Sequence, residues 1–188
     1  MDKPLLILDL DETLIYAEPG NPSDDRPVDF HIPGHRVLRR PYLTEFLETT
    51  GLWFELAVWS SASTPYVRSM VAKIFPAPEA LAFAWSSDRC TLRYHAELQT
   101  CYCVKDLKKV KRLGYDLGRV LMVDDTPSKL ERNYGNHLPV DPFEGQPGDT
   151  ELRDVLPFLD RLREAEDVRR IEKRAWRELV RRGPGPEP

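Results

Sequence analysis

Short apolar runs that end in polar residues alternate with segments of helical period along this chain. Leu5–Leu8, Leu56–Trp59 and Val120–Val123 are continuous apolar runs, the pattern of strands buried on both faces. Thr44–Thr50, followed by Gly51, predicts a short helix, and a second helix is expected after Ser63. The alternation of strands and helices predicts an α/β fold with a mostly parallel central sheet.

Two stretches predict small antiparallel structures beside that sheet. Residues 18–29 are rich in Pro, Gly and Asp and predict a loop, and the alternation that follows predicts a flap hairpin turning at Pro33-Gly34. Residues 80–102 have the pattern of short strands with turns. We therefore expect a small β-rich insert at about residues 80–103, before Lys105, and no large helical cap.

The second half of the chain predicts more helices. Leu107, Val110 and Leu113 share one helical face, and Ser128-Lys-Leu-Glu131 has the pattern of a capping box at a helix start. Residues 138–140 suggest one more strand, and residues 150–182 predict helix in two pieces, divided around Pro157 and Asp167. We expect a single domain over residues 1–182 and a disordered tail at 183–188.

The composition is that of an ordinary globular domain and excludes several classes. The 188 residues are 41% hydrophobic and carry a net charge of -4, which argues against a general nucleic-acid binder. No apolar run reaches membrane-spanning length, and no secretion signal is recognisable. Three cysteines, an odd number, predict reduced thiols and a cytoplasmic protein, and Cys101-Tyr-Cys103 lacks the second pair that a zinc site needs.

The three apolar strands all end in polar residues of the kind found in active sites. Asp9 follows the first strand, Ser60 the second, and the pair Asp124-Asp125 ends the third. In a parallel sheet these strand ends meet at one edge, where ligands of such folds bind. Asp11 stands two residues after Asp9, so both carboxylates are expected at that edge.

Carboxylates gathered at one edge predict a metal ion and phosphoryl transfer. Four such groups repel one another, and Mg²⁺, which prefers oxygen ligands, relieves the repulsion. One aspartate can attack phosphorus to form an aspartyl-phosphate, and a second can protonate the leaving oxygen and then activate water. The hydroxyl of Ser60 and the charge of Lys105 suit the phosphoryl oxygens.

The same residues carry a resemblance to a known family. "DLDET" at residues 9–13 is similar to the DxDxT signature of the haloacid-dehalogenase (HAD) superfamily, and Ser60, Lys105 and Asp124-Asp125 resemble its later motifs. "RRPYLTEFL", "YCVKDLKKVKRLGYDLGRVLMVDDTP" and "NHLPVDPFEGQPGDTELRDVLPFLDRL" narrow the likeness to the small C-terminal-domain phosphatases, also called NLI-interacting-factor-like phosphatases. The likeness extends from about Pro4 to Val168 in the family's order.

The resemblance implies a Rossmann-like HAD core and a Mg²⁺-dependent phosphatase acting on phosphoserine or phosphothreonine in proteins. By position, Asp9 is the nucleophile and Asp11 the general acid and base. The metal ligands implied are Asp9, the backbone carbonyl of Asp11, and Asp125. The remaining implied roles are phosphoryl binding by Ser60 and Lys105, support of the metal shell by Asp124, and shaping of the loop by Thr13.

Three positions depart from the family's usual pattern. Ser60 stands where many relatives have Thr, which keeps the hydroxyl. Asp125 stands where many have Asn, and the added charge favours metal over free phosphate. Tyr42 stands where a Gly often follows the Arg-Pro pair, so the shape near the substrate groove is expected to differ.

Other functions remain as alternatives at this point. The same core could hydrolyse a small-molecule or nucleic-acid-end phosphate ester, although a short β-rich insert suits an open site for a phosphorylated protein or peptide. A receiver module also combines Asp, Thr or Ser, and Lys around Mg²⁺, but its acid pair comes early in the chain and it lacks DxDxT. A non-catalytic phosphoprotein-binding module is disfavoured because no motif is missing.

Partner surfaces also remain open. Arg36, Arg39 and Arg40 either contact a phosphopeptide near the flap or are surface charges. The basic segment 168–182 has an apolar stripe, for which packing on the core is favoured over binding of nucleic acid or membrane. We expect neither a membrane nor a nucleic acid as partner, and a nuclear location is an alternative if the source is eukaryotic.

Overall fold

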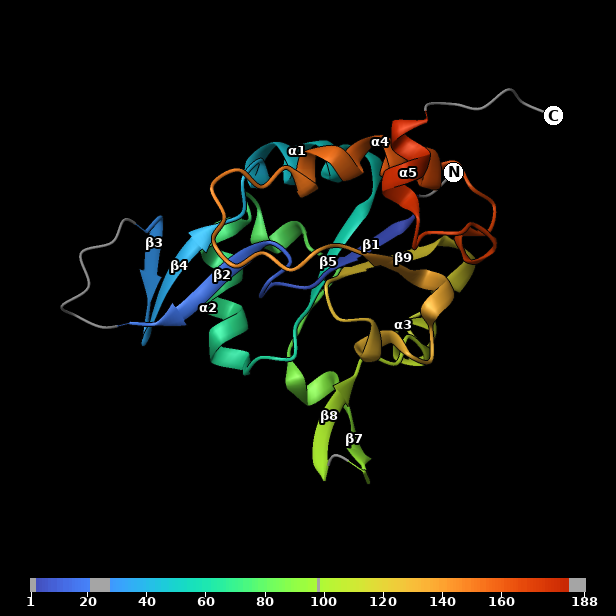
Figure 1. Cartoon of the computed structure of the whole chain (residues 1–188). Helices are drawn as coiled ribbons and strands as arrows, with labels where there is room; N and C mark the ends of the chain where they lie inside the picture. Colours follow the sequence, from blue (N-terminus) through green and yellow to red (C-terminus); the bar gives the residue numbers. More distant parts are fainter. Residues whose placement is uncertain (1–2, 21–27, 98, 183–188) are drawn as a thin grey trace.

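A five-stranded parallel sheet forms the centre of the molecule (Figure 1). The computed structural model describes residues 3–20, 28–97 and 99–182. The order of the strands in the sheet is β10-β9-β1-β5-β6, and every neighbouring pair is parallel. Their bounds are β1 Leu5–Leu8, β5 Glu55–Trp59, β6 Ala84–Trp85, β9 Val120–Asp124 and β10 His137–Pro139. The predicted mostly parallel α/β fold is confirmed.

The two faces of the sheet are covered by different elements. Leu6 and Leu8 of β1 pack in the larger core with the helices α1, α2, α4 and α5, whereas Leu5 and Ile7 pack in a smaller core with Val110 of α3. The helices are α1 Leu43–Trp53, α2 Thr64–Ile74, α3 Lys108–Lys111, α4 Glu151–Arg163 and α5 Trp176–Arg181. Each fully buried aliphatic side chain contributes about 1.5–3 kcal/mol, which explains why continuous apolar runs lie in the centre.

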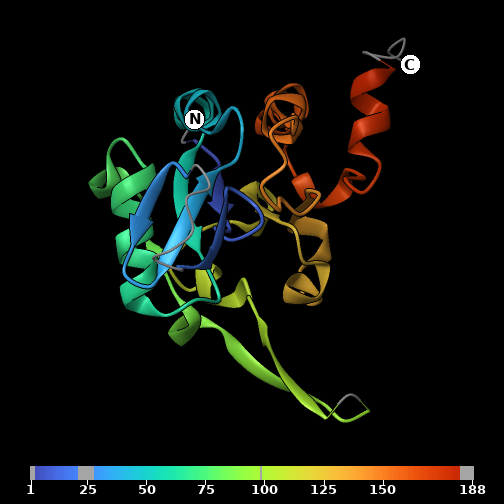
Figure 2. The same cartoon turned by 60° about the vertical axis from the view of Figure 1, so that its left-hand side comes forward.

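Two small antiparallel sheets extend from this body (Figures 1 and 2). The flap consists of β2 Ile15–Pro19, β4 His35–Arg39 and β3 Phe30–Ile32, with Gly34 in the turn at φ 80°. The hairpin of β7 Thr91–His95 and β8 Thr100–Val104 projects separately, at the bottom of both views. Both confirm the predicted flap and β-rich insert. Most of the predicted loop at 18–29 lies in residues 21–27, outside the described ranges.

Several predicted helix boundaries are wrong. The first helix continues through Gly51 to Trp53, where the amide of Phe54 donates to the carbonyl of Thr50. The last helical segment is divided around Asp167, as predicted, since α4 ends at Arg163 and α5 begins at Trp176. It is not divided at Pro157, which lies inside α4 on its exposed side. The helix through Val110 ends at Lys111, before the exposed Leu113.

The predicted capping box at Ser128 is also wrong. Residues 127–130 form a 3₁₀ turn, η4, with no capping hydrogen bond from a side chain. The amide of Lys129 donates to the carbonyl of Thr126 at 3.1 Å, and that of Glu131 donates to Ser128 at 3.4 Å. The other 3₁₀ turns are η1 Pro78–Ala80, η2 Ser87–Arg89, η3 Leu117–Arg119, η5 Tyr134–Asn136 and η6 Val168–Arg170.

The C-terminal segment packs on the core, as favoured from its apolar stripe. Val168 and Trp176 are each 1% exposed, and the indole Nε1 of Trp176 donates to the carbonyl of Pro139 at 2.8 Å. Within the part of the chain that the structure describes, no helix is both long and apolar enough to cross a membrane. The predicted tail at 183–188 lies outside the described residues.

Arg40 connects the flap to the loop before α4 from a fully buried position. Its guanidinium makes a two-pronged ion pair with Asp149, at 2.9 and 2.8 Å, and donates to the backbone carbonyls of Thr13 and Asp141. The side chain is 0% exposed. Both interpretations offered for Arg40 from the sequence, phosphopeptide contact and surface charge, are therefore wrong, because burial and these partners occupy the whole group.

Tyr42 stands where the resemblance implies a glycine, and its backbone has a conformation that glycine favours. Its φ of 65° lies in the left-handed region, which side chains disfavour and glycine adopts freely. The hydroxyl accepts a hydrogen bond from Arg153 at 3.1 Å, and the guanidinium of Arg153 lies 4.9 Å from the ring centre. These contacts between α1 and α4 compensate for the strained backbone.

Arg40→Met is expected to destabilise the protein by about 3 kcal/mol or more, because it leaves the carboxylate of Asp149 without its cation in a mostly buried place. Urea unfolding of the wild type and the variant measures the difference. Arg39→Met is the matched control. Arg39 is the exposed neighbour of Arg40 in the sequence, and its replacement is expected to change the stability by about 1 kcal/mol or less. Equal losses in both variants would contradict the proposed importance of the buried pair.

Candidate functional site

The register of the sheet brings the predicted strand ends together. Leu8 pairs with Val58 on one side and with Val123 on the other, so Asp9 and Asp124 follow at the same level of neighbouring strands. Asp9 continues the ladder, since its amide donates to the carbonyl of Val123 at 3.0 Å. The carboxyl ends of β1, β5 and β9 therefore form one edge, where the functional residues were expected.

Asp9 lies at the centre of this edge with its carboxylate fixed by charged and neutral donors. Its Oδ2 lies 2.9 Å from Nζ of Lys105 and accepts a hydrogen bond from Nζ of Lys129 at 2.8 Å. Its Oδ1 accepts from the amide of Leu10 at 2.8 Å. Burial by itself would raise the pKa of Asp9, but the charges of Lys105 and Lys129 outweigh it and lower the pKa. Asp9 is thus an ionised, oriented carboxylate.

Asp124 and Asp125 lie beside Asp9 and are held by different partners. Asp124 accepts hydrogen bonds from Nζ of Lys105 at 2.6 Å and from the amide of Thr126 at 2.9 Å. Burial, together with a neighbouring carboxylate, raises the pKa of Asp124 to about 7. Asp125 accepts from the hydroxyls of Thr126 at 2.8 Å and Thr13 at 3.4 Å. The hydroxyl of Thr13 therefore links the first motif to the last.

Asp11 is oriented from α2 rather than from the sheet. The hydroxyl of Tyr66 donates to Oδ1 of Asp11. Glu12, the next residue, has a φ of 61°, which turns the chain sharply after the first strand. Burial raises the pKa of Asp11, and the hydrogen bond from Tyr66 offsets only part of this rise. Asp11 therefore differs from Asp9 in its proton affinity although the two are two residues apart.

Ser60 lies at the same edge, directly after β5, and is 1% exposed. Its amide donates to the carbonyl of Trp85 at 3.0 Å, and its Oγ accepts from the amide of Ala62 at 3.0 Å. The hydroxyl hydrogen remains available to a ligand in this arrangement. The next residue, Ser61, is partly exposed.

The sequence patterns predicted no role for Lys129, nor for Tyr66, which donates to Asp11. Nζ of Lys129 lies 2.8 Å from Asp9, 3.6 Å from Asp124 and 3.7 Å from Asp125. The pattern Ser128-Lys-Leu-Glu131 predicts a helix cap, and this interpretation gave no role to a lysine four residues after Asp125. The turn places Nζ of Lys129 3.7 Å from Asp125, so the spacing of four residues was the signal available in the sequence.

The carboxylates can accommodate a metal ion. Asp9, Asp124 and Asp125 each offer an oxygen, and these oxygens all lie within 4.8 Å of one another. A set of hard oxygen donors with excess negative charge fits a divalent cation such as Mg²⁺ or Ca²⁺ far better than a soft metal. The residues present therefore fit the metal that the sequence predicted.

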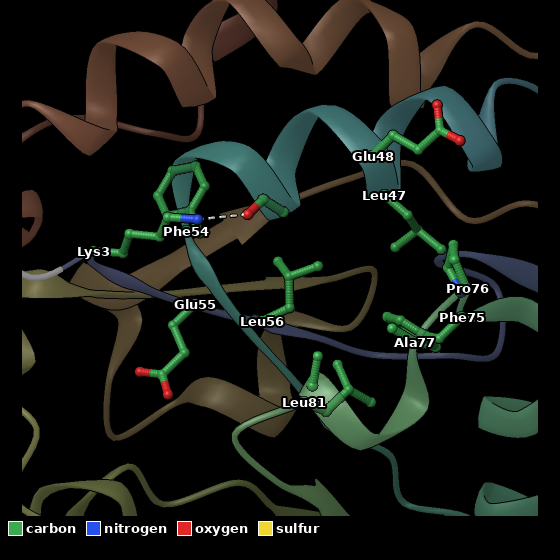
Figure 3. A pocket seen from close by; sticks show the side chains of 12 residues that line it. Lys3, Leu47, Glu48, Phe54, Glu55, Leu56, Phe75, Pro76, Ala77 and Leu81 are labelled. Atoms are coloured by element: carbon green, nitrogen blue, oxygen red, sulfur yellow. Dashed lines mark hydrogen bonds between the residues drawn. The ribbon is translucent and has the colours of Figure 1, made fainter.

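An apolar groove elsewhere in the molecule is separate from this edge. It has a volume of about 690 Å³ and is lined by residues including Leu47 of α1, Leu56 of β5 and Leu81 (Figure 3). Lys3 borders it and donates to the carbonyl of Gly51 at 2.8 Å. The groove lies at the amino ends of β1 and β5, opposite the carboxyl ends that carry the aspartates.

Comparisons with known proteins agree with this geometry. The model of the family described as NLI interacting factor-like phosphatase matches residues 4–169. CTD nuclear envelope phosphatase 1 of Xenopus laevis is 30% identical over 185 residues, which cover 92% of this chain and 72% of the relative. The Homo sapiens carboxy-terminal domain RNA polymerase II polypeptide A small phosphatase 1 is 34% identical over 173 residues, covering 89% of this chain and 62% of the relative.

Solved structures show the same fold. The fission yeast RNA polymerase II CTD phosphatase Fcp1 bound to beryllium fluoride aligns with a TM-score of 0.58 and 20% identity, over 79% of this chain and 44% of that chain. A HAD-like family hydrolase from Porphyromonas gingivalis aligns with a TM-score of 0.50 and 12% identity, over 86% of this chain and 98% of that chain. At these identities the likeness establishes the HAD-type fold alone.

Tyr66→Phe is expected to raise the pKa of Asp11 further, because a hydroxyl that donates to a carboxylate favours its ionised form. The pKa can be followed by carboxyl ¹³C NMR as the pH is varied, with chelator present. Tyr115→Phe is the control, since the hydroxyl of Tyr115 donates to the distant Glu55. An unchanged or lowered pKa of Asp11 in Tyr66→Phe would show that the tyrosine does not control this carboxyl.

Proposed function

We propose that this chain, which belongs to the NLI interacting factor-like phosphatase family, hydrolyses phosphoserine or phosphothreonine in proteins through an aspartyl-phosphate on Asp9. The family and the HAD fold make the chain a phosphatase of the phosphoric monoester class. The observation that carries the residue assignment is the carboxylate of Asp9, ionised and held between Lys105 and Lys129 at the carboxyl edge of the sheet.

Asp9 is suited to act as the nucleophile. A carboxylate attacks phosphorus only in its ionised form, and the two lysines keep Asp9 ionised in a buried place. The amide of Leu10 fixes one oxygen and so fixes the direction of the other. The bond from this carboxylate to phosphorus forms as the bond from phosphorus to the seryl or threonyl oxygen breaks.

Asp11 is suited to move the proton. Its raised pKa lets the carboxyl donate a proton to the departing oxygen, and the resulting carboxylate can then accept a proton from the water that hydrolyses the aspartyl-phosphate. Tyr66 holds the group in place for both steps. The same residue thus serves as acid and then as base.

Ser60 and Lys105 are suited to hold the transferring phosphoryl group. The hydroxyl of Ser60 retains a hydrogen to donate, and the ammonium of Lys105 lies against the nucleophile where negative charge accumulates. Lys105 is completely buried, so little water lies around its ammonium to weaken the attraction of the phosphoryl oxygens. Together they replace water around the phosphoryl oxygens.

Mg²⁺ is the proposed cofactor, held by Asp9, Asp125 and the backbone carbonyl of Asp11. Asp124 would support these metal ligands from a neighbouring position, because its own oxygens accept hydrogen bonds from Lys105 and from the amide of Thr126. When bound, Mg²⁺ neutralises negative charge on the phosphoryl oxygens. The choice of Mg²⁺ follows from the oxygen donors and from the resemblance.

The short inserts support a phosphorylated protein or peptide as substrate. The segment between Ser60 and Lys105 contributes α2 and a projecting hairpin rather than a large helical cap (Figure 2). An open edge admits a phosphorylated side chain carried on a polypeptide, whereas a lidded site suits metabolites. Relatives named as phosphatases of the RNA polymerase II C-terminal domain fit this class of substrate. A small phosphate ester is the second candidate.

The domain boundaries and the location follow from the sequence. We propose that residues 1–182 act as one phosphatase domain, with the insert at about 80–103. A cytoplasmic location is favoured by the three cysteines, all of which are free in the structure. A nuclear location fits the relatives that are named for the nuclear envelope.

Asp9→Asn is expected to abolish hydrolysis of both p-nitrophenyl phosphate and a phosphoserine peptide, because an amide cannot form the aspartyl-phosphate. Steady-state release of phosphate is measured with Mg²⁺ and with excess chelator. The wild type is expected to be active only with the metal. Asp88→Asn, which changes an exposed aspartate outside the described site, is the control and should keep full activity.

Two outcomes would contradict this account. Turnover by a folded Asp9→Asn protein would remove Asp9 as nucleophile. Hydrolysis of p-nitrophenyl phosphate without hydrolysis of any phosphoserine, phosphothreonine or phosphotyrosine peptide would favour the small-ester alternative. Circular dichroism of each variant verifies that the fold is intact.

A further inference from the structure

Lys129 places a positive charge where a divalent cation would bind. Its ammonium faces Asp9, Asp124 and Asp125 at 2.8, 3.6 and 3.7 Å. These are the same three residues whose oxygens lie within 4.8 Å of one another. An ammonium and a metal ion cannot both occupy the space between three carboxylates.

Lys105 and Lys129 differ in how firmly each is held. The side chain of Lys105 is 0% exposed and its ammonium contacts Asp9 and Asp124 at 2.9 and 2.6 Å. The side chain of Lys129 is 19% exposed and starts from the short turn η4. Lys105 is therefore a permanent partner of the carboxylates, whereas Lys129 can leave them.

The backbone of Lys129 stays in place when its side chain moves. Its carbonyl accepts from the amide of Lys105 at 2.7 Å, and its amide donates to the carbonyl of Thr126 at 3.1 Å. Four flexible methylene groups connect this fixed backbone to the ammonium. A movement of the ammonium toward solvent thus needs only side-chain rotation.

The charges of the site make such a movement favourable when metal arrives. Asp9, Asp11, Asp124 and Asp125 carry up to four negative charges, and Lys105 and Lys129 supply two positive ones. Without a metal, the ammonium of Lys129 reduces repulsion among three close carboxylates, to which Lys105 brings only one positive charge. A divalent cation brings two charges to the same place and makes the ammonium redundant there.

We propose that Lys129 is an internal counter-cation that competes with the divalent metal for Asp9 and Asp125. Its ammonium holds the carboxylates together in the metal-free protein and turns toward solvent when the metal binds. The inference rests on the metal site of the proposed function. It predicts that the lysine stabilises the metal-free protein and weakens metal binding, two effects that a purely structural lysine would not combine.

Melting temperatures of the chelator-treated protein, measured across a series of MgCl₂ concentrations, test the competition. Without metal, Lys129→Met is expected to melt below the wild type. With MgCl₂ the melting temperature of Lys129→Met should rise more than that of the wild type. The rise should begin at a MgCl₂ concentration about tenfold lower, because one close charge–charge repulsion of the metal is removed. Lys129→Arg, which keeps the charge, should not bind Mg²⁺ more tightly than the wild type.

Lys111→Met is the matched control, since it removes the same charge from an exposed position on α3 and should behave as the wild type. Equal or weaker Mg²⁺ binding by Lys129→Met would overturn the inference while leaving the phosphatase assignment intact. No Mg²⁺-dependent shift in any of the proteins would overturn both the inference and the proposed metal site. Phosphatase activity, measured separately, distinguishes the two cases.

A labelling experiment on the wild type avoids any dependence on the folding of variants. Acetic anhydride modifies accessible lysines, and mass spectrometry of peptides gives the rate at each site. Adding MgCl₂ is expected to increase labelling of Lys129 several-fold, because its ammonium leaves the carboxylates. Lys111 should label equally in both states, and the buried Lys105 in neither. An unchanged or slower rate at Lys129 would overturn the inference.

Discussion

The buried ion pairs of Lys105 with Asp9 and Asp124 are the interaction on which the site depends. Charges buried this deeply are stable only when each has a close partner of opposite sign, and here one ammonium lies 2.9 and 2.6 Å from two carboxylates. Asp9 and Asp124 come from neighbouring strands, whereas Lys105 comes from the end of the projecting hairpin. The pairs therefore join the central sheet to the insert, and the backbone bond from Lys105 to the carbonyl of Lys129 adds η4 to the same assembly.

The DxDxT segment at residues 9–13 is also held in place by Arg40, which directly follows the flap strand β4. Arg40 donates to the carbonyl of Thr13 and to Asp149, and so ties the DxDxT segment to the chain before α4. The hydroxyl of Thr13 reaches Asp125 at 3.4 Å. The positions of the candidate catalytic aspartates thus depend on contacts between residues more than a hundred positions apart.

Much of the fold and of the site could be predicted from the sequence because the strands and the residues at their ends follow local sequence patterns. Apolar runs such as Leu5–Leu8 gave the strands, and a polar residue at the end of each run gave Asp9, Ser60 and Asp124. The order of the motifs then identified the family. Buried strands and strand-end aspartates can be recognised in a sequence because each requires a specific residue type at a specific position.

What could not be predicted depends on partners that are distant in sequence. Arg40 was predicted to be a charged residue at the surface of the flap, because no residue close to it in the sequence indicates that it pairs with Asp149. Lys129 was assigned to a helix cap because its pairing with Asp9 exists only after the sheet has formed. Pro157 was taken for a helix break, but it lies on the exposed side of α4 and the helix tolerates it.

The central claim is that Asp9 is the carboxylate that carries the phosphoryl group, and a crystal structure with beryllium fluoride and Mg²⁺ tests it most directly. Beryllium fluoride forms tetrahedral adducts with carboxylates that resemble an acyl phosphate. The account predicts an adduct on Asp9, with Lys105 and Ser60 against the fluorines and the metal between Asp9 and Asp125. An adduct on Asp11, Asp124 or Asp125 instead would contradict it.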